Sequence, residues 1–386
     1  MSAGRLPLFP VTTVGSWPRP QVLLTALRRR RGGLIDRPEF DRVADAAVID
    51  VLRRQEAAGV DLVTDGEQRR DNFYSFVAGK LEGVRLMTLG EMLDVVEDKA
   101  GFERILRTLD VPAYSISNPT CVGRIERREP LAVDELLFLR RHTDRPIKVT
   151  LPGPYLLTRA MWVKEVTRAV YPSKEDLAED VVLVLKREAA ELREAGADFI
   201  QLDEPVLTEL VFTQGQTRTF MCAALAARRD PVEELEFAVD LINRVVEGLS
   251  SVRTGVHVCR GNWSRNEETL LRGSYDPLVP CFNRLNVQQL VLEYATPRAG
   301  PLVALDAKEI GLGVVNPRIA EAEDVDEVVQ RVREALRSFP AERIFLNPDC
   351  GFGTFSSRPM NTPEVAERKV AVMVKAAQEL RKAESS

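Results

Sequence analysis

One histidine and two cysteines of this chain stand where metal ligands are expected. His257 and Cys259 lie at the end of an apolar run, and Cys350 lies in the motif Asn347-Pro-Asp-Cys-Gly351. The chain of 386 residues has only two histidines and five cysteines, so composition alone does not explain their place at the ends of predicted strands. Two thiolates and one imidazole suit Zn²⁺ far better than Mg²⁺ or Ca²⁺, and the carboxylate of Glu293 would complete a tetrahedral set.

The spacing of these residues favours an active site over a zinc finger. Zinc fingers use CxxC pairs that close small loops, whereas these ligands are far apart in sequence and meet only if several strand ends converge. A thiolate-rich zinc with an exchangeable position binds an incoming thiol and keeps it ionised at neutral pH, while hydrolytic zinc sites more often use His and carboxylate ligands. The ligand set therefore predicts alkylation of a thiol, with a closed structural zinc site as the alternative.

Short β-rich runs alternate along the chain with longer segments of helical period, which is typical of a parallel sheet covered by helices. Eight such strands favour an α/β fold with a single (β/α)₈ barrel, and no Gly-rich phosphate fingerprint follows the first strand. The predicted strands are 11–16, 60–65, 147–151, 198–203, 253–259, 288–294, 311–316 and 343–348. The predicted helices are 38–58, 176–195, 231–249, 324–338 and 363–383.

The segment near 80–145 is too long for one crossover between the second and third strands. We expect an inserted excursion that packs beside the mouth of the barrel. The expected organisation is one barrel domain over residues 1–386.

Composition limits the class of partner. The net charge is −5 and the basic runs are short, so Arg28–Arg31 is interpreted as a solvated helix end and nucleic acid is not expected as a partner. No segment approaches the roughly 18 apolar residues of a membrane span. Residues 1–10 lack the apolar stretch of a signal peptide, and an odd number of cysteines fits a reducing cytoplasm.

Polar residues cluster after several predicted strands, where barrel enzymes place their catalytic groups. Ser16 follows the first strand, Glu67 the second and Asp203 the fourth. Arg69 and Arg70 are candidates to hold a sulfonate or phosphate of a substrate, although arginines more often form surface ion pairs.

Several of these motifs resemble the C-terminal catalytic barrel of cobalamin-independent methionine synthase, in the family's order and across nearly the whole chain. The matching segments are Thr13-Val-Gly-Ser-Trp-Pro-Arg19, Asp65-Gly-Glu67, Gln201-Leu-Asp-Glu-Pro205, His257-Val-Cys259, Leu292-Glu293-Tyr294 and Asn347-Pro-Asp-Cys-Gly351.

The resemblance implies two groups of site residues. Carboxylates suit the ammonium of an amino-acid substrate and a hydroxyl suits its carboxylate, although an internal salt bridge is the alternative role for the carboxylates. The implied zinc ligands are His257, Cys259, Glu293 and Cys350, and the implied homocysteine-binding residues are Ser16, Glu67 and Asp203.

Two departures from the family bear on the methyl donor. The sequence shows no counterpart of the N-terminal barrel of the full-length enzymes, which helps to bind folate polyglutamate. It also has no histidine after the seventh strand, where the chain reads Gly313-Val-Val-Asn-Pro-Arg318 and the family carries an acid for the departing folate. The second histidine, His142, is predicted on a surface helix. A donor other than folate is therefore expected.

The short single-barrel members of the family include methionine synthases that take methyl from a corrinoid and an epoxyalkane:coenzyme M transferase. The leading prediction is zinc-dependent methyl transfer to homocysteine, in which Glu293 is a displaceable ligand and Glu67 and Asp203 orient the thiol substrate. Coenzyme M addition to an epoxide, with Arg69 and Arg70 on the sulfonate, and a non-catalytic zinc or thiol-binding protein are the alternatives. A corrinoid protein and a second copy of the chain are candidate partners, and the sequence leaves the donor, the thiol and the oligomeric state open.

Overall fold

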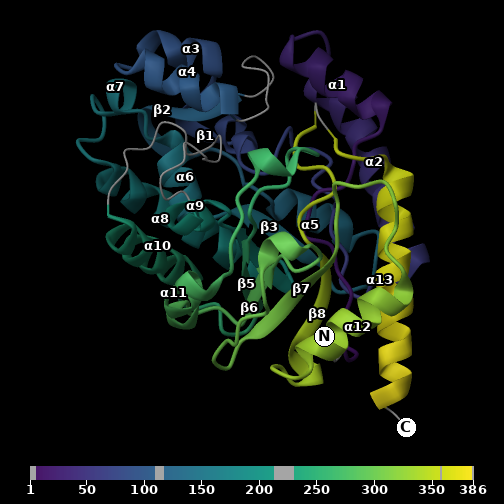
Figure 1. Cartoon of the computed structure of the whole chain (residues 1–386). Coiled ribbons are helices and arrows are strands. Elements are labelled where there is room, and N and C mark those ends of the chain that lie inside the picture. The colour runs from purple at the N-terminus through teal and green to yellow at the C-terminus, as the bar shows by residue number, and fades with distance from the viewer. Residues whose placement is uncertain (1–5, 109–116, 213–229, 357–358, 385–386) are drawn as a thin grey trace.

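A parallel sheet forms the centre of the computed structural model, which describes residues 6–108, 117–212, 230–356 and 359–384. Its strand order is β3-β4-β5-β6-β7-β8, so neighbours in the sheet are also neighbours in sequence (Figure 1). The strands are β3 (Lys148–Pro152), β4 (Phe199–Asp203), β5 (Arg253–Val258), β6 (Gln289–Leu292), β7 (Glu309–Val315) and β8 (Ile344–Pro348).

Two short segments close this sheet into a barrel. Residues 11–12 and 62–63 stand between β8 and β3 and occupy the places of the first two predicted strands. The predicted (β/α)₈ barrel is confirmed, although its first two strands are single bridges and not continuous ladders. The parallel bridges are Val11–Leu346, Thr12–Leu62 and Val63–Ile147.

Side chains supply hydrogen bonds where these first two strands lack a regular ladder. The hydroxyl of Thr12 donates to the carbonyl of Leu62 over 2.7 Å. The amide of Gln55 accepts from the Thr64 N–H at 3.0 Å and donates to the Thr64 carbonyl at 2.8 Å. Because side-chain partners replace strand partners here, the segments stay short and still satisfy their backbone groups.

Helices cover the outside of the barrel, and none of those described is long and apolar enough to cross a membrane (Figure 1). Asp36 and Ser173 accept from the backbone of the first turns of α2 and α8, which fixes where these helices begin. The five predicted helices are α2 (Arg37–Ala58), α8 (Lys174–Glu194), α10 (Pro231–Val246), α12 (Val325–Ala335) and α13 (Pro363–Glu384). The shorter ones are α1 (Gln21–Arg31), α5 (Val133–Arg140), α6 (Pro154–Met161), α7 (Lys164–Thr167), α9 (Val206–Phe212) and α11 (Val279–Arg284).

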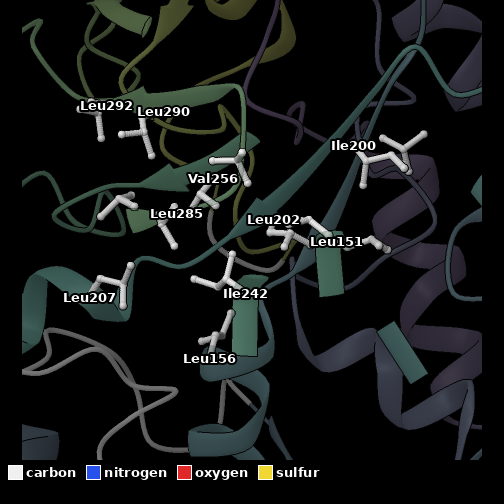
Figure 2. Packing of buried hydrophobic residues seen from close by; sticks show 14 of the residues in the cluster. Leu151, Leu156, Ile200, Leu202, Leu207, Ile242, Val256, Leu285, Leu290 and Leu292 are labelled. Atoms are coloured by element: carbon white, nitrogen blue, oxygen red, sulfur yellow. The ribbon is translucent and has the colours of Figure 1, made fainter. Parts of the chain in front are cut away.

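Side chains alternate between the two faces of each barrel strand. Leu151, Leu202 and Val256 belong to three adjacent strands and face the helical layer, where Leu156 of α6 and Ile242 of α10 join them (Figure 2). The intervening residues of the same strands point toward the barrel axis. Many of these are polar, and they form the floor beneath the barrel mouth.

The excursion between the second and third barrel strands is a β-hairpin that carries two helices. β1 (Leu81–Thr88) pairs antiparallel with β2 (Ser117–Arg127), and α3 (Leu89–Val95) and α4 (Lys99–Thr108) follow β1. The sequence places an excursion here but does not predict its strands. In Figure 1, α3 and α4 lie at the same end of the molecule as α1.

Polar contacts tie β2 to the helices of the barrel. Asn118 donates to the carbonyl of Ala160 in α6 over 2.6 Å. Arg127 forms a buried ion pair with Glu188 of α8. The excursion therefore packs against the barrel wall.

Candidate metal and substrate site

His257, Cys259 and Cys350 converge at the C-terminal mouth of the barrel. β5 delivers His257 and Cys259, which are two residues apart and so share a face, while Cys350 follows β8. One ligand atom from each residue lies within 4.8 Å of the other two, and all three residues are buried. The structure thus brings together three of the four predicted metal ligands.

Asp203 orients the imidazole of His257. The two residues are register partners on β4 and β5, and Asp203 Oδ1 lies 3.1 Å from His257 Nδ1. Nε2 of His257 is buried and has no hydrogen-bond partner in the described structure. A carboxylate on one ring nitrogen commonly leaves the other free for a metal. This unpartnered nitrogen beside two thiols fits a zinc ion.

The three ligands also share protons. The thiol of Cys259 and the imidazole of His257 lower the pKa of Cys350 to about 5, although burial opposes this. Burial tends to lower the pKa of His257, but Asp203 and Cys350 outweigh it and raise the value to about 10. Binding of a metal ion would displace these protons, because metal ligands must be deprotonated.

Glu293 does not join the three-ligand group. Its carboxylate accepts from the side-chain amide of Asn262, and Arg298 Nη2 lies 3.3 Å from Oε2. Arg260 adds a second cation at 3.5 Å from the same oxygen. Its charge still adds to the raised pKa of Cys259, for which the neighbouring Cys350 is the main cause. Glu293 therefore lies near the thiols but is bound by other residues.

A single pocket opens over the three ligands. It contains Ser16, Glu67 and Asp203, the three residues expected to bind homocysteine. Its empty volume is about 700 Å³, including open solvent at the mouth. The apolar side of the pocket is lined by Val14, Phe73, Tyr74, Pro205, Trp263 and Phe355.

Glu67 adopts an unusual backbone conformation. Its φ is 52°, directly after Gly66 at 67°, and such left-handed residues other than glycine often mark functional sites. Oε1 accepts from the hydroxyl of Thr150 at 2.8 Å, while Oε2 is buried without a partner in the described structure. Burial raises the pKa of this carboxyl to about 7, although Arg70 opposes the rise. The unpaired oxygen is available to a cationic ligand group.

Ser16 lies against the loop that carries Cys350. Its hydroxyl accepts from the Gly353 N–H at 3.3 Å. A Cβ at Gly351 would overlap this hydroxyl, so glycine lets the two loops approach with the Ser16 side chain in its present position. The contact connects a predicted substrate-binding residue with a predicted metal ligand.

Arg69 and Arg70 do not line the pocket. Arg69 pairs with Asp45 and lies over the ring of Phe138 at 4.6 Å. Arg70 is buried and donates to Glu135 over 2.6 Å. Both guanidinium groups thus have a carboxylate partner in the helical layer, and the contact with a sulfonate stays a prediction.

The loop after β7 supplies no histidine to the pocket. Arg318 is buried there and pairs with Glu267 at 2.5 Å, and its Nε donates to Asn262 at 3.1 Å. His142 lies just beyond α5, where its Nδ1 is 2.8 Å from the Phe138 carbonyl. Among the residues that the structure describes, His257 is the only histidine in the pocket lining.

The sequence interpretation did not assign a role to several polar residues next to the site. Asn262 and Arg298 hold Glu293, Thr150 holds Glu67, and Lys148 lies in the barrel floor. Asn262 follows β5 closely, so its place after a strand end was the one available signal. The partners of Thr150 and Lys148 depend on strands that are distant in sequence.

Comparison with known proteins identifies the family. The model of the family described as "Cobalamin-independent synthase, Catalytic domain" matches residues 9–379. The chain is 31% identical over 376 residues to methionine synthase of Saccharolobus solfataricus, with 96% of this chain and 94% of the relative covered. It is 32% identical over 384 residues to methionine synthase of Pyrococcus abyssi, with 98% and 94% covered.

The fold has a counterpart among solved structures. A B12-independent methionine synthase from Shewanella sp. W3-18-1, in complex with selenomethionine, gives a TM-score of 0.71 at 24% identity, with 97% of this chain and 98% of that chain covered. This likeness supports the barrel architecture independently of the residues at the site. The family match over residues 9–379, together with the two relatives that are 31% and 32% identical, shows that this chain belongs to the cobalamin-independent methionine synthase family.

Proposed function

We propose that this protein methylates homocysteine to methionine at a zinc site formed by His257, Cys259 and Cys350. The grouping of these three ligand atoms within 4.8 Å, beneath a pocket that also contains Glu67, is the observation that carries the proposal. His257, Cys259 and Cys350 would hold the zinc ion, which would act as a Lewis acid that favours ionisation of the substrate thiol.

The residues around the ligands would bind and orient homocysteine. The unpartnered Oε2 of Glu67 is the proposed acceptor for the substrate ammonium, and the hydroxyl of Ser16 is the proposed donor to its carboxylate. Asp203 would contact the substrate and also orient His257, because it lines the pocket and lies within hydrogen-bond distance of the imidazole. The aromatic side of the pocket would exclude water and receive the methyl donor.

Glu293 is proposed as a fourth ligand only when its present partners release it. Asn262 and Arg298 compete for its carboxylate, so any bond to zinc would be weak and readily displaced by a substrate thiol. This arrangement suits a site that must accept a thiol in every turnover.

We propose a corrinoid-type methyl donor, because the pocket lining has no second histidine to protonate a departing folate nitrogen. We also propose that the chain acts as one barrel domain with the hairpin of β1 and β2 as an insertion, since Arg127 and Asn118 join the hairpin to the barrel helices. A single unfolding transition would follow from that organisation.

The function is tested by product analysis. Zinc-loaded protein is incubated with homocysteine or coenzyme M and offered methylcobalamin, methyltetrahydrofolate or epoxypropane, and the products are identified by mass. Methionine formed with methylcobalamin, and lost in Cys350→Ser, supports the proposal. Product only from coenzyme M and epoxypropane would assign the transferase alternative, and zinc binding without any turnover would indicate a non-catalytic protein.

A further inference from the structure

A buried hydrogen-bond chain runs from the floor of the barrel to the proposed metal site. Lys148 Nζ donates to Gln201 Oε1 over 3.1 Å, and Gln201 Nε2 donates to Asp203 Oδ1 over 2.8 Å. Asp203 Oδ1 then lies 3.1 Å from His257 Nδ1. All four residues are at most 5% exposed, so water competes little with these contacts.

The strands of the barrel build this chain. Gln201 and Asp203 are two residues apart on β4 and therefore face the same side. Lys148 enters from the first position of β3, and His257 is the register partner of Asp203 on β5. Three adjacent strands thus place four polar side chains in one line.

The chemistry of the four groups determines which atom donates and which accepts in each of these hydrogen bonds. An ammonium group has donors only, so the residue it contacts must present an acceptor, here the oxygen of the Gln201 amide. The amide nitrogen is then left to donate to Asp203 and to the carbonyl of Val14. A carboxylate only accepts, so Nδ1 of His257 must carry the proton, which leaves the lone pair on Nε2.

We infer that Lys148, acting through Gln201 and Asp203, is a positioning residue that fixes the tautomer of His257 for metal binding. The inference rests on the zinc site proposed above and adds to it a residue that contacts neither metal nor substrate. Lys148 is also the buried counter-charge to Asp203 and Glu67, whose negative charges oppose the lowering of its pKa to about 7 by burial.

The tautomer of His257 can be observed directly because the chain has only two histidines. Zinc-loaded protein with ¹⁵N-labelled histidine, kept near pH 6.5, is examined by long-range ¹⁵N–¹H correlation, and His142→Gln assigns the second ring. We expect one Nδ1-protonated ring for His257 in the unmodified chain. In Lys148→Met and in Gln201→Met the signal should split or broaden.

Zinc affinity, measured by competition with a chelator, gives the second readout. Each variant should bind zinc about ten- to a hundred-fold more weakly, as is usual when the partner of a metal-bound histidine is disturbed. The double variant should lose no more zinc affinity than the weaker-binding single variant, because both changes interrupt the same series of hydrogen bonds. Lys369→Met is the matched control, since Lys369 is equally buried but pairs with Glu323, and neither residue lines the pocket.

The outcomes separate the two proposals. Folded Lys148→Met and Gln201→Met variants with normal zinc affinity and an unchanged His257 signal would overturn the role of Lys148 alone. Should Lys148→Met fail to fold, Gln201→Met interrupts the same series of hydrogen bonds and decides whether it fixes the tautomer of His257. An unmodified chain that binds no zinc would overturn the zinc site itself and this inference with it.

Discussion

Arg298 Nη2 lies 3.3 Å from Oε2 of Glu293, and both side chains are buried. This ion pair holds the carboxylate outside the group formed by His257, Cys259 and Cys350. A buried ion pair is costly to break once formed, because each charge left alone loses its partner in a region without water. Glu293 could therefore bind a metal ion only after Arg298 releases its carboxylate. The two thiols and the imidazole already lie close together.

Removing Glu293 should accordingly affect zinc binding less than removing a thiol. Glu293→Gln keeps the shape of the side chain and should retain most of the zinc, whereas Cys259→Ser or Cys350→Ser should lose most of it, because an alcohol is a poor replacement for a thiolate. Zinc per chain after challenge with a chelator measures the difference. Equal loss in all three variants would indicate a closed four-ligand structural site.

Glu67→Gln should weaken homocysteine binding without loss of zinc. The change removes the ionic partner proposed for the ammonium, and a charge-assisted hydrogen bond of roughly 1.5–3 kcal/mol corresponds to about a ten- to hundred-fold loss of affinity. Calorimetric titration of the zinc-loaded protein measures the constant. A thiol without an ammonium, such as coenzyme M, is the control and should bind equally to both proteins. An unchanged homocysteine constant would exclude this role for Glu67.

Asp203→Asn should reduce both homocysteine affinity and zinc affinity. From the sequence alone, Asp203 is expected to hold only the substrate, so the change should leave zinc in place. The structure adds the 3.1 Å contact with His257, so an amide at this position would disturb the imidazole as well. Parallel titrations with zinc and with homocysteine test the double effect, and a loss confined to homocysteine would show that the contact with His257 is dispensable.

Homocysteine affinity should rise with pH between about 6 and about 8. Burial raises the pKa of Glu67 to about 7, so the carboxylate that attracts the ammonium forms only as pH passes that value. Glu67→Gln should lose this pH dependence.

Because the native pKa is raised, the contribution of Glu67 to stability is fully present below the unfolded value and is lost as pH rises through about 7. The stability of Glu67→Gln relative to the unmodified chain should therefore increase as pH rises from the unfolded pKa of 4.5 to about 7. A difference in unfolding free energy that stays constant over this range would contradict the raised pKa of Glu67.

Methyltetrahydrofolate should be a much poorer donor than methylcobalamin. Its departing nitrogen needs a proton, general acid catalysis is typically worth about 10²–10⁴-fold, and the loop after β7 offers Asn316 and Arg318 in place of a histidine. A guanidinium group is not a general acid at neutral pH, and the guanidinium of Arg318 is paired with Glu267. Asn316→His should raise the folate rate, with Asn316→Gln as the matched control. Folate turnover as fast as methylcobalamin turnover in the unmodified chain would overturn this expectation.

The barrel and most of the proposed metal site could be predicted from local sequence signals. His257 and Cys259 are two residues apart at a strand end, so their shared face follows from the period of a strand. Cys350 also follows a strand, and strand ends meet at one rim of a barrel. The sequence predicts the first two strands but not that they are single bridges, because Gln55, a helix residue, supplies hydrogen bonds to Thr64 that a neighbouring strand would otherwise make.

The roles of long charged side chains could not be predicted in the same way. Arg69 and Arg70 are close in sequence to Glu67, but their partners, Asp45 and Glu135, belong to helices elsewhere in the chain. A guanidinium group reaches far from its Cα, so proximity in sequence does not determine what it binds. The same reason explains why the capture of Glu293 by Arg298 emerged only from the structure.

We propose that His257, Cys259 and Cys350 hold a zinc ion to which a homocysteine thiol binds directly. X-ray absorption at the zinc edge counts the sulfur neighbours of the metal with and without homocysteine. We predict two sulfur neighbours in the zinc-loaded protein alone and three after homocysteine is added. An unchanged sulfur count on addition of homocysteine would contradict the account.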